Sequence, residues 1–285
     1  SEGLFSSAIV QSGTCNNISM TLSTAEEYGS EFASALGCDD DSLNCLRSAS
    51  VNDIMAVDTS TFSTLGSFTP NVDGVLVPDY PGMLFYTGAF HNVTVVAGVT
   101  ANEGSVFTNS MGLETAEELT EMLTDWAGFV GVSDVDALLS LYTIEEHGSA
   151  QMAFDQFYGD VAFVCPTKSF LNMSSYHTPT YGYYYSHEPS WLSFYPELSE
   201  WGAFHASELQ FVFGLDQQYL TPAEQEMSTQ LRGLWRAVAA GENLGSYDWQ
   251  VYREMNATQF DSEYWLELKT GEFGSLSDVR PDRCD

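Results

Sequence analysis

A glutamate and a histidine, far apart in the chain, each follow a stretch with the composition of a buried strand. Glu103 stands in an Asn-Glu-Gly turn just after the apolar, β-branched run 93–99. His205 comes after the aromatic run 180–186, in the motif Phe-His-Ala-Ser-Glu-Leu. A carboxylate that orients an imidazole, which then takes a proton from a serine, activates that serine for attack on a carbonyl group. The two stretches therefore predict the acid and the base of a Ser–His–acid hydrolase.

The order of these residues along the chain favours an α/β-hydrolase. In that fold the nucleophile, the acid and the histidine follow successive strands in that order. A short apolar strand at 8–10, which is predicted to be buried, precedes the strand at 93–99, and a third strand at 180–186 precedes His205. The 285 residues contain no G-x-S-x-G nucleophile elbow. Ser12 is no substitute, because it follows the end of a strand rather than standing on a strand-to-helix turn.

Each of these residues also has a purely structural interpretation. A glutamate before a glycine is most often a turn residue, and a histidine among aromatic residues is most often a hydrogen-bonded core group. Glu208, about one helical turn after His205, fits a buried helper of the acid–histidine pair and a plain helix acid equally well. We expect His187 to be structural. The other histidines are expected on the surface or in loops: His91, His147 and His177.

The remaining sequence predicts the elements that hold these residues. Helices are predicted at 24–36, 41–48, 51–56, 80–88, 114–129, 134–142, 150–158, 162–176, 209–213 and 221–240. Thr24 is expected to cap the first of them, with Glu27 as its capping-box partner and Gly37 at its end. The helix 162–176 is expected to be interrupted near Pro166. With a turn-rich segment at 68–79 and a short strand at 264–268, the pattern indicates a mostly parallel α/β sheet with large helical insertions.

The charge balance excludes several classes of partner. The chain has 40 acidic and 8 basic residues, a net charge of −32. A nucleic-acid backbone would be repelled, and no basic stripe offers a local exception. Anionic membrane surfaces are excluded as partners for the same reason. An acidic, solvated surface is typical of an exported protein, and steering of a cationic substrate is the alternative interpretation.

Sequons favour export and glycosylation. No apolar run reaches the roughly 18 residues of a transmembrane helix, so no membrane-spanning segment is predicted. The first residues have neither the basic region nor the apolar region of a signal peptide. Four Asn-X-Ser/Thr sequons nevertheless fall in polar or loop-like settings, and they predict a secreted glycoprotein. They begin at Asn17, Asn92, Asn172 and Asn256.

The cysteines also favour an oxidising compartment. Cys38 and Cys45 bracket a short polar loop suited to a local disulfide, and Cys165 with Cys284 is the natural long-range pair. Cys15 is left over and suggests a partner outside the chain. No histidine lies at ligand spacing from these cysteines, so a metal site is not favoured. Neither a cofactor nor a metal is expected.

Seven motifs sharpen this interpretation. They are GLFSSAIVQSG, LGCDDDSLNCLRS, FTPNVDGVLVPDYP, VAGVTANEGSVF, FVCPTKSF, FHASELQFVFG and LRGLWRAVAAGENL with a following W. In this order they resemble successive landmarks of the type-B carboxylesterase/cholinesterase/lipase family, and the resemblance runs from Gly3 to the last cysteine. It implies an α/β-hydrolase fold and acyl transfer through a serine, a histidine and a glutamate.

The resemblance also implies roles for particular residues. Glu103 corresponds to the family's triad acid, His205 to its general base, and Ser12 to a hydroxyl that hydrogen-bonds the acid. The pairs Cys38–Cys45 and Cys165–Cys284 correspond to two family disulfides. The family's nucleophile motif, G-E-S-A-G, does not occur here. We therefore expect residues 1–285 to be the C-terminal part of a single α/β-hydrolase domain, with an N-terminal part of the same enzyme as its partner.

Two functions from different classes follow. The first is a secreted ester hydrolase that acts on a small-molecule or lipid ester, with this chain supplying Glu103 and His205. The second is a catalytically inactive, esterase-like ectodomain that serves in binding or adhesion. The residue at the elbow decides between them, since serine supports the enzyme and glycine or alanine the binding protein. We expect the 285-residue chain alone to be inactive, because it lacks the nucleophile.

Overall fold

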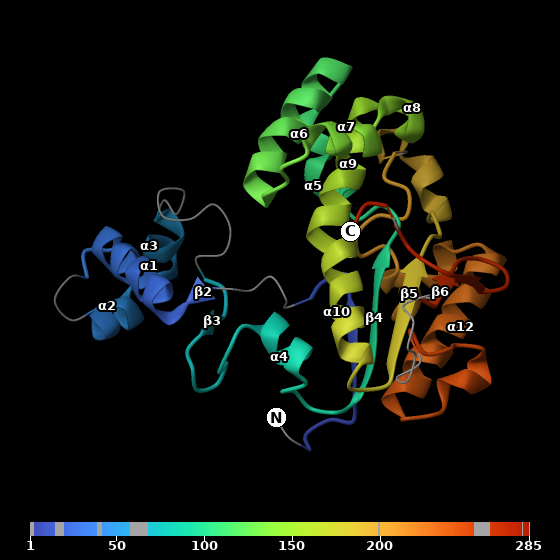
Figure 1. Ribbon diagram of the computed structural model, residues 1–285, viewed down its shortest axis with the longest axis horizontal. Helices are drawn as coiled ribbons and strands as arrows, with labels where there is room; N and C mark the ends of the chain where they lie inside the picture. Colours follow the sequence, from blue (N-terminus) through green and yellow to red (C-terminus); the bar gives the residue numbers. More distant parts are fainter. Residues whose placement is uncertain are drawn as a thin grey trace. The chain divides into compact units, whose positions relative to one another are not determined.

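The computed structural model describes residues 3–14, 20–38, 42–57, 68–198, 200–253, 263–280 and 282–284 (Figure 1). The chain forms two compact units. The larger unit comprises Ser1–Thr14 and Gly88–Asp285, and the smaller one comprises Cys15–Thr87. The larger unit holds the main sheet and all three predicted site residues.

A five-stranded sheet forms the centre of the larger unit, in the order β1-β4-β5-β6-β7. Its strands are β1 (Ser7–Gln11), β4 (Thr94–Thr100), β5 (Thr180–Tyr185), β6 (Trp265–Leu268) and β7 (Gly274–Leu276). The first four are parallel to one another, and β7 is antiparallel to β6. In the register, Ser7 pairs with Thr94, Val95 with Thr180, and Gly182 with Trp265. The predicted strands are confirmed, and β7 is an addition.

Burial explains why β4 was the clearest strand in the sequence. Six of its seven residues are buried, and a parallel strand covered on both faces leaves a continuous apolar run. The prediction that β1 is buried was wrong, because all five of its residues are only partly buried. The reason is its position, since β4 is its only partner in the described part of the sheet.

Helices pack against the sheet. The long helix α12 (Pro222–Ala239) contributes Leu231 and Leu234 to a core that also contains Tyr183 and Tyr185 of β5. Successive residues of a strand point to opposite faces, so Tyr184 points away from α12. Helix α10 (Cys165–Ser175) contacts β4 and β5 (Figure 1).

A large helical insertion connects β4 to β5, as predicted. Its helices are α5 (Ser105–Thr108), a 3₁₀ turn (Asn109–Met111), α6 (Ala116–Val130), α7 (Val135–Leu141), α8 (Ile144–His147), α9 (Ala150–Gly159) and α10. Helix α6 begins with a capping box between Thr115 and Glu118 and ends at Gly131, whose φ of 79° only glycine adopts readily. Leu119, Leu123 and their neighbours form a second apolar core inside the insertion.

The boundary between α9 and α10 differs from the prediction. The sequence predicted separate helices with an interruption near Pro166, whereas α9 and α10 are joined through a π-helical turn, Asp160–Val164. In this turn the N–H of Cys165 donates to the carbonyl of Asp160. Pro166 lies in the first turn of α10, where a missing N–H is tolerated. Such π turns are rare in proteins as a whole, and those that occur are often found at functional sites.

Short helices and α12 follow β5. The 3₁₀ turns are Ser190–Phe194, Pro196–Leu198, Gln217–Tyr219 and Leu244–Tyr247, and α11 spans Leu209–Val212. Helix α12 confirms the helix predicted at 221–240, and it opens with Pro222. Thr221 caps it through a capping box with Glu224.

The smaller unit contains the predicted short helices. Its elements are β2 (Met20–Thr21), α1 (Leu22–Ala35), α2 (Ser42–Ser48), α3 (Val51–Ala56), β3 (Asn71–Val72) and α4 (Pro81–Thr87). The predicted cap of α1 was wrong. Thr21, not Thr24, is the N-cap, and its hydroxyl accepts the N–H of Thr24. The helix ends before Gly37, which has a left-handed φ of 71°.

Both predicted disulfides are present, Cys38–Cys45 and Cys165–Cys284. Cys15 and the sequons at Asn17 and Asn256 lie outside the described residues. Within the described part of the chain, the helices are all too short or too polar to cross a lipid bilayer.

Candidate active site

Glu103 is a buried carboxylate at the carboxyl end of β4. It is 1% exposed, and its Oε1 accepts the backbone N–H of Thr100 at 2.6 Å. Its Oε2 lies 2.6 Å from Nδ1 of His205. The structure thus brings together two residues that are 102 positions apart in sequence. At this distance the carboxylate fixes the orientation of the imidazole ring.

The glycine that follows Glu103 is required by packing. A Cβ atom on Gly104 would lie 1.9 Å from the carbonyl oxygen of Asp155 in α9. On the facing helix, a Cβ atom on Gly159 would lie 2.9 Å from the backbone nitrogen of Gly104. The acid loop therefore lies directly against α9, backbone to backbone. This contact explains why the Asn-Glu-Gly turn follows the strand.

The loop that carries His205 is bonded directly to the acid loop. The N–H of Asn102 donates to the carbonyl of Ala203 at 3.0 Å, and the N–H of Ala203 donates to Oδ1 of Asn102 at 3.0 Å. Asn102 and Phe204 also form an isolated parallel bridge. Each of these residues is one or two positions from a member of the pair. The backbone contacts therefore set the distance between Glu103 and His205.

The environment of His205 suits a general base. Burial alone would lower the pKa of His205, but the hydrogen bond and charge of Glu103 and the charge of Glu208 outweigh it and raise the pKa above its ordinary value of 6.5. Nδ1 faces the carboxylate, so Nε2 is the nitrogen that can exchange a proton with a hydroxyl. The side chain is 27% exposed, which leaves the ring accessible. The residue after it, Ala206, has a left-handed φ of 70°.

Aromatic rings line the imidazole of His205. The ring of Phe163 lies 4.7 Å from it, centroid to centroid, and that of Phe107 lies 5.1 Å away. The two phenylalanines stack on each other at 5.5 Å. Sequence reasoning missed both, because Phe163 lies in the π turn and Phe107 in the short helix α5. The only available signal was the position of Phe107 in the motif around Glu103.

Ser12 does not make the hydrogen bond to the acid that the resemblance implied. Its side chain is buried, and its hydroxyl has no hydrogen-bond partner among the described residues. The two recorded bonds of the Glu103 carboxylate go to Thr100 and His205. The backbone of Ser12 has a φ of 52°, and its N–H donates to the carbonyl of Gly98 at 2.9 Å, which extends the β1–β4 pairing.

Glu208 is a buried acid rather than an exposed helix residue. It is 1% exposed, and burial is the main cause that raises the pKa of its carboxyl. Its Oε1 accepts a hydrogen bond from Nε2 of Gln11 at 3.0 Å. Gln11 in turn accepts from the indole of Trp235 at 3.1 Å. Sequence reasoning did not identify Gln11, whose side-chain partners are more than 190 positions away.

Comparison with known proteins decides the family. A model of the carboxylesterase family matches residues 1–273. The chain belongs to the carboxylesterase family. The acetylcholinesterase of Bungarus fasciatus is 30% identical over 271 residues, which are 85% of this chain and 44% of that protein. Human cocaine esterase is 27% identical (85% and 46%), and rat acylcarnitine hydrolase is 29% identical (75% and 40%).

Family membership confirms the α/β-hydrolase fold and the resemblance on which it was predicted. The mostly parallel sheet with its helical insertion agrees with that fold. The chain spans less than half the length of each of these curated relatives. The expectation that residues 1–285 are the C-terminal part of one domain stays a prediction.

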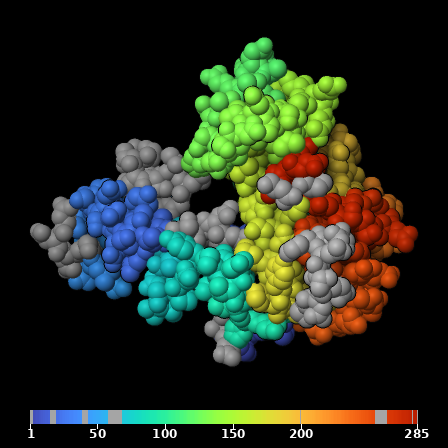
Figure 2. All heavy atoms as spheres, viewed as in Figure 1, coloured from blue at the N-terminus to red at the C-terminus, as the bar shows by residue number. Residues whose placement is uncertain are grey.

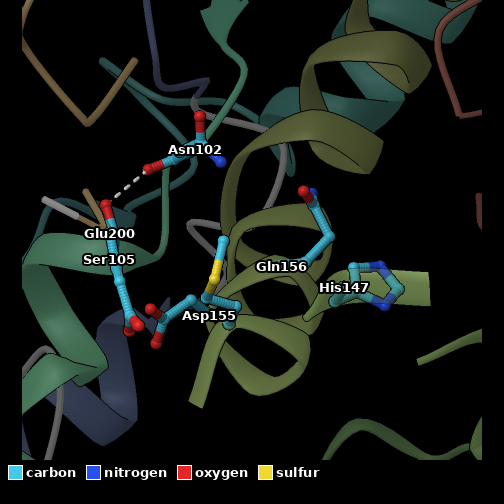
Figure 3. A pocket seen from close by; sticks show the side chains of 7 residues that line it. Asn102, Ser105, His147, Asp155, Gln156 and Glu200 are labelled. Carbon is cyan, nitrogen blue, oxygen red and sulfur yellow. Dashed lines mark hydrogen bonds between the residues drawn. The ribbon is translucent and has the colours of Figure 1, made fainter. Parts of the chain in front are cut away.

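A small polar cavity lies behind the acid loop of this carboxylesterase-family chain (Figure 3). It is lined by Asn102, Ser105, His147, Met152, Asp155, Gln156 and Glu200. Burial raises the pKa of the Asp155 carboxyl, while hydrogen bonds from Thr108 and Gln151 oppose the rise. Within the ranges that the structure describes, no three His, Cys, Asp or Glu side chains are close enough together to hold a metal ion.

The remaining histidines have structural contacts. His187 lies 3.1 Å from Glu224, in a network that joins it to α12, as expected of a structural residue. His147 ends α8, and its ring stacks on that of Tyr142. The other two contact aromatic rings just before strands of the main sheet begin: His91 with Phe5, and His177 with Phe90.

Proposed function

We propose that this chain supplies the acid and the base of a serine carboxylic-ester hydrolase. The observation that carries the proposal is the 2.6 Å contact between the buried carboxylate of Glu103 and Nδ1 of His205. The strand ends that deliver these residues are neighbours in the sheet, β4 and β5. The relatives support hydrolysis of an ester bond, since they are an acetylcholinesterase, a cocaine esterase and an acylcarnitine hydrolase.

The nucleophile comes from a serine in a part of the protein that precedes this chain. Nε2 of His205 takes the proton from the serine hydroxyl as the serine oxygen attacks the ester carbonyl. Glu103 stabilises the imidazolium that forms. The imidazolium then gives its proton to the departing alcohol, and an acyl-enzyme remains. His205 then takes a proton from water as the water oxygen attacks the acyl carbonyl. The bond to the serine oxygen breaks, the carboxylic acid leaves, and the imidazolium returns its proton to the serine oxygen. Backbone N–H groups stabilise the oxyanion in both steps.

The pH dependence follows from the state of His205. The base must be neutral to accept a proton, and its pKa is raised by Glu103 and Glu208. Activity is therefore lost as the pH falls through a pKa above the ordinary value of 6.5. The substrate class is a small-molecule or lipid ester. The disulfides and sequons support export of the protein as a secreted glycoprotein.

The test uses the complete protein and a fluorophosphonate probe, which reacts with activated serines. We expect a labelled species that contains this chain, and hydrolysis of a 4-nitrophenyl ester. His205→Ala should lower kcat by at least about 10³-fold, because triad members act as a unit. His91→Ala, in the loop before β4, is the matched control and should keep its activity.

A loss below about tenfold for His205→Ala would show that the histidine is wrongly assigned. If no species that contains this sequence is labelled, the protein is an esterase-like binding protein. In that case Glu103 and His205 only stabilise the fold.

A further inference from the structure

The residues that follow β7 reach the helical insertion and are anchored there. Figure 2 shows the last described residues, in red, against the insertion in green and α10 in yellow. Cys284 forms its disulfide with Cys165, the first residue of α10. Arg280 and Arg283 point to the buried carboxylate of Asp160 in the π turn. We call Arg280, Arg283 and Cys284 the latch.

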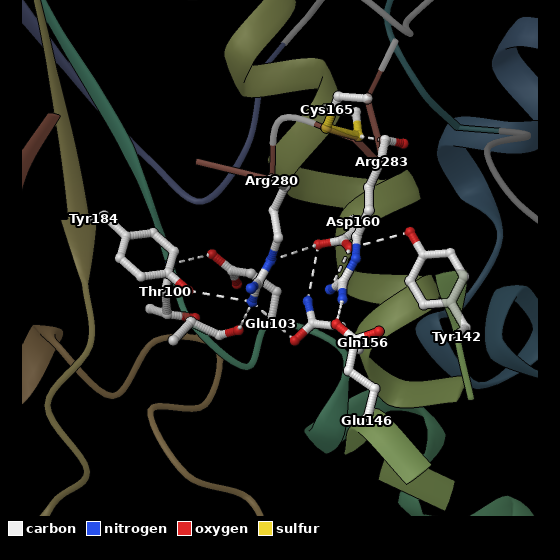
Figure 4. A network of polar contacts seen from close by, with 12 residues as sticks. Thr100, Glu103, Tyr142, Glu146, Gln156, Asp160, Cys165, Tyr184, Arg280 and Arg283 are labelled. Carbon is white, nitrogen blue, oxygen red and sulfur yellow. Dashed lines mark hydrogen bonds and ion pairs between the residues drawn. A yellow bond between two sulfur atoms is a disulfide. The ribbon is translucent and has the colours of Figure 1, made fainter. Parts of the chain in front are cut away.

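Arg280 joins four separate elements through one guanidinium group (Figure 4). Its Nη2 lies 3.2 Å from the carbonyl of Ala101, 2.9 Å from Oε1 of Gln156 and 3.2 Å from the hydroxyl of Tyr184. Its Nε lies 3.4 Å from Oδ1 of Asp160. The planar guanidinium can hold these partners together, whereas the single ammonium of a lysine cannot reach all of them.

Asp160 depends on the latch. Its side chain is 1% exposed, Oδ2 accepts the hydroxyl of Tyr142 at 3.1 Å, and Oδ1 accepts Nε2 of Gln156 at 2.8 Å. Burial raises the pKa of the Asp160 carboxyl, and the charges of Arg280 and Arg283 oppose that rise. Removing a partner from a buried ion pair is strongly destabilising, because a buried charge is left without compensation. The π turn and the latch therefore stabilise each other.

The backbone of Arg280 is held in an unfavourable conformation. Its φ is 56°, in the left-handed region that residues with a side chain rarely adopt. Such a conformation is strained and persists only where the surroundings determine it. Here the guanidinium contacts and the disulfide at Cys284 determine it.

The partners of the latch lie next to residues that contact Glu103 and His205. Ala101, which binds Arg280, directly precedes Asn102, and Asn102 is bonded to the histidine loop. The π turn that contains Asp160 also carries Phe163, whose ring lies 4.7 Å from the imidazole of His205. A shift of the latch would therefore move Glu103 through Ala101 and Asn102. It would move His205 through Asn102 and also through Phe163.

We propose that the latch is a positioning device for the catalytic pair, and that Arg280 holds in place the acid loop and the π turn, whose contacts with the histidine loop fix the distance between Glu103 and His205. The inference rests on the proposed ester hydrolase function. Arg280 touches no reacting atom, and it acts through the carbonyl of Ala101 and the carboxylate of Asp160. It is a positioning residue, not a catalytic one.

The experiment separates positioning from charge balance. In the complete protein, Arg280→Met leaves Asp160 short of a partner and lowers the melting temperature. Adding Asp160→Asn removes the uncompensated charge, so the double variant should regain most of that stability. The contact to Ala101 stays lost in both variants. We expect kcat for a 4-nitrophenyl ester to remain about 10- to 100-fold below the wild-type value in the double variant, with little change in KM, because a misplacement of about 1 Å has this effect.

A pH profile gives a second readout that a structural role would not change. The charged groups that face the His205 imidazole are the carboxylates of Glu103 and Glu208, and the buried phenol of Tyr183 lies in the field of both. A longer hydrogen bond to Glu103 stabilises the protonated imidazole less, so it lowers the pKa of His205. The acid limb of the kcat/KM profile should therefore move to lower pH in the double variant. Arg280→Lys should show the same shift, because lysine keeps the positive charge but lacks the planar guanidinium that binds several partners at once.

The controls distinguish the inference from the function on which it rests. Arg236→Met removes an exposed arginine that pairs with Glu242, and it should leave kcat and the profile unchanged. One outcome would refute the inference alone. The wild type would hydrolyse the ester, His205→Ala would abolish that activity, and yet the double variant would have the kcat and the pH profile of the wild type. The latch would then have no positioning role. If the wild type itself neither hydrolyses the ester nor reacts with a fluorophosphonate, the proposed function is wrong, and this inference, which rests on it, is wrong as well.

Discussion

Replacing Glu224 with glutamine tests the buried network that anchors α12. Glu224 is 1% exposed, and each of its carboxylate oxygens accepts a backbone N–H, Oε1 from Ser190 at 2.8 Å and Oε2 from Thr221 at 2.8 Å. The hydroxyls of Ser190 and Thr221 add bonds to Oε2 at 2.6 and 2.7 Å, and His187 lies 3.1 Å from Oε1. A glutamine amide would place its NH₂ group against an N–H donor in either orientation. At least one buried donor would therefore lose its acceptor.

The magnitude follows from the pKa of Glu224. Burial alone would raise this pKa, but the hydrogen bonds from Ser190 and Thr221 outweigh it and lower the pKa from 4.5 to about 2. That difference corresponds to about 3 kcal/mol of folding free energy at neutral pH. Because the pKa is lower in the folded state, this stabilisation is complete above pH 4.5 and is lost as the pH falls towards 2. At pH 3 about 1.4 kcal/mol should remain.

The assay is urea unfolding of the wild type and of Glu224→Gln, followed by tryptophan fluorescence between pH 3 and pH 7. The difference between the two proteins isolates this carboxylate from the many others that titrate in the same range. Glu242→Gln, which removes an exposed carboxylate paired with Arg236, is the matched control and should change the free energy of unfolding by less than about 1 kcal/mol. A Glu224→Gln effect that is the same at pH 3 and pH 7 would refute the reasoning, as would an effect below about 1 kcal/mol at pH 7.

Two further predictions concern the acid loop and the surface. Gly104→Ala should lower the free energy of unfolding by at least about 2 kcal/mol and reduce fluorophosphonate labelling, because the new methyl group would overlap the Asp155 carbonyl. Gly128→Ala, in the exposed face of α6 with open space around it, is the control and should stabilise by about 0.5–1 kcal/mol; equal effects of the two would contradict the packing argument. Peptide mapping of the protein expressed through a secretory pathway should find a glycan on Asn92, which is exposed in a loop, and none on Asn172, which is half-buried in α10. A glycan on Asn172 would show that the face of α10 around it is open.

The strands and the acid–histidine pair could be predicted because their signals are local. A strand buried on both faces, such as β4, leaves a short and nearly continuous apolar run. Its length and its β-branched residues distinguish this run from a buried helix. The Asn-Glu-Gly turn after it carries its own packing requirement at Gly104. The caps of α6 and α12 are equally local, since each uses a threonine and a glutamate three residues later. Glu103 and His205 therefore met in the structure as the motifs suggested.

The features that were missed depend on contacts between distant residues. The π turn places Asp160 against Arg280 and Arg283, which lie more than a hundred residues away, so local helix propensity predicted an ordinary break at Pro166. The Gln11–Glu208 bond joins residues 197 positions apart. The cap of α1 was misplaced for a different reason, because Thr21 and Thr24 are both good caps and propensity alone does not choose between them.

The register of the main sheet also has a consequence for how the protein folds. Ser7 pairs with Thr94, Val95 with Thr180, and Gly182 with Trp265, so every parallel pairing closes a loop of roughly 85 residues. Chains dominated by such distant pairings fold slowly, because the entropy of closing each loop is lost before the contacts form. The insertion between β4 and β5 has a core of its own and is made of local contacts. We expect the insertion to become structured early, while the strands of the main sheet are still unpaired. The time that these strands remain unpaired should then determine both the folding rate and the tendency to aggregate.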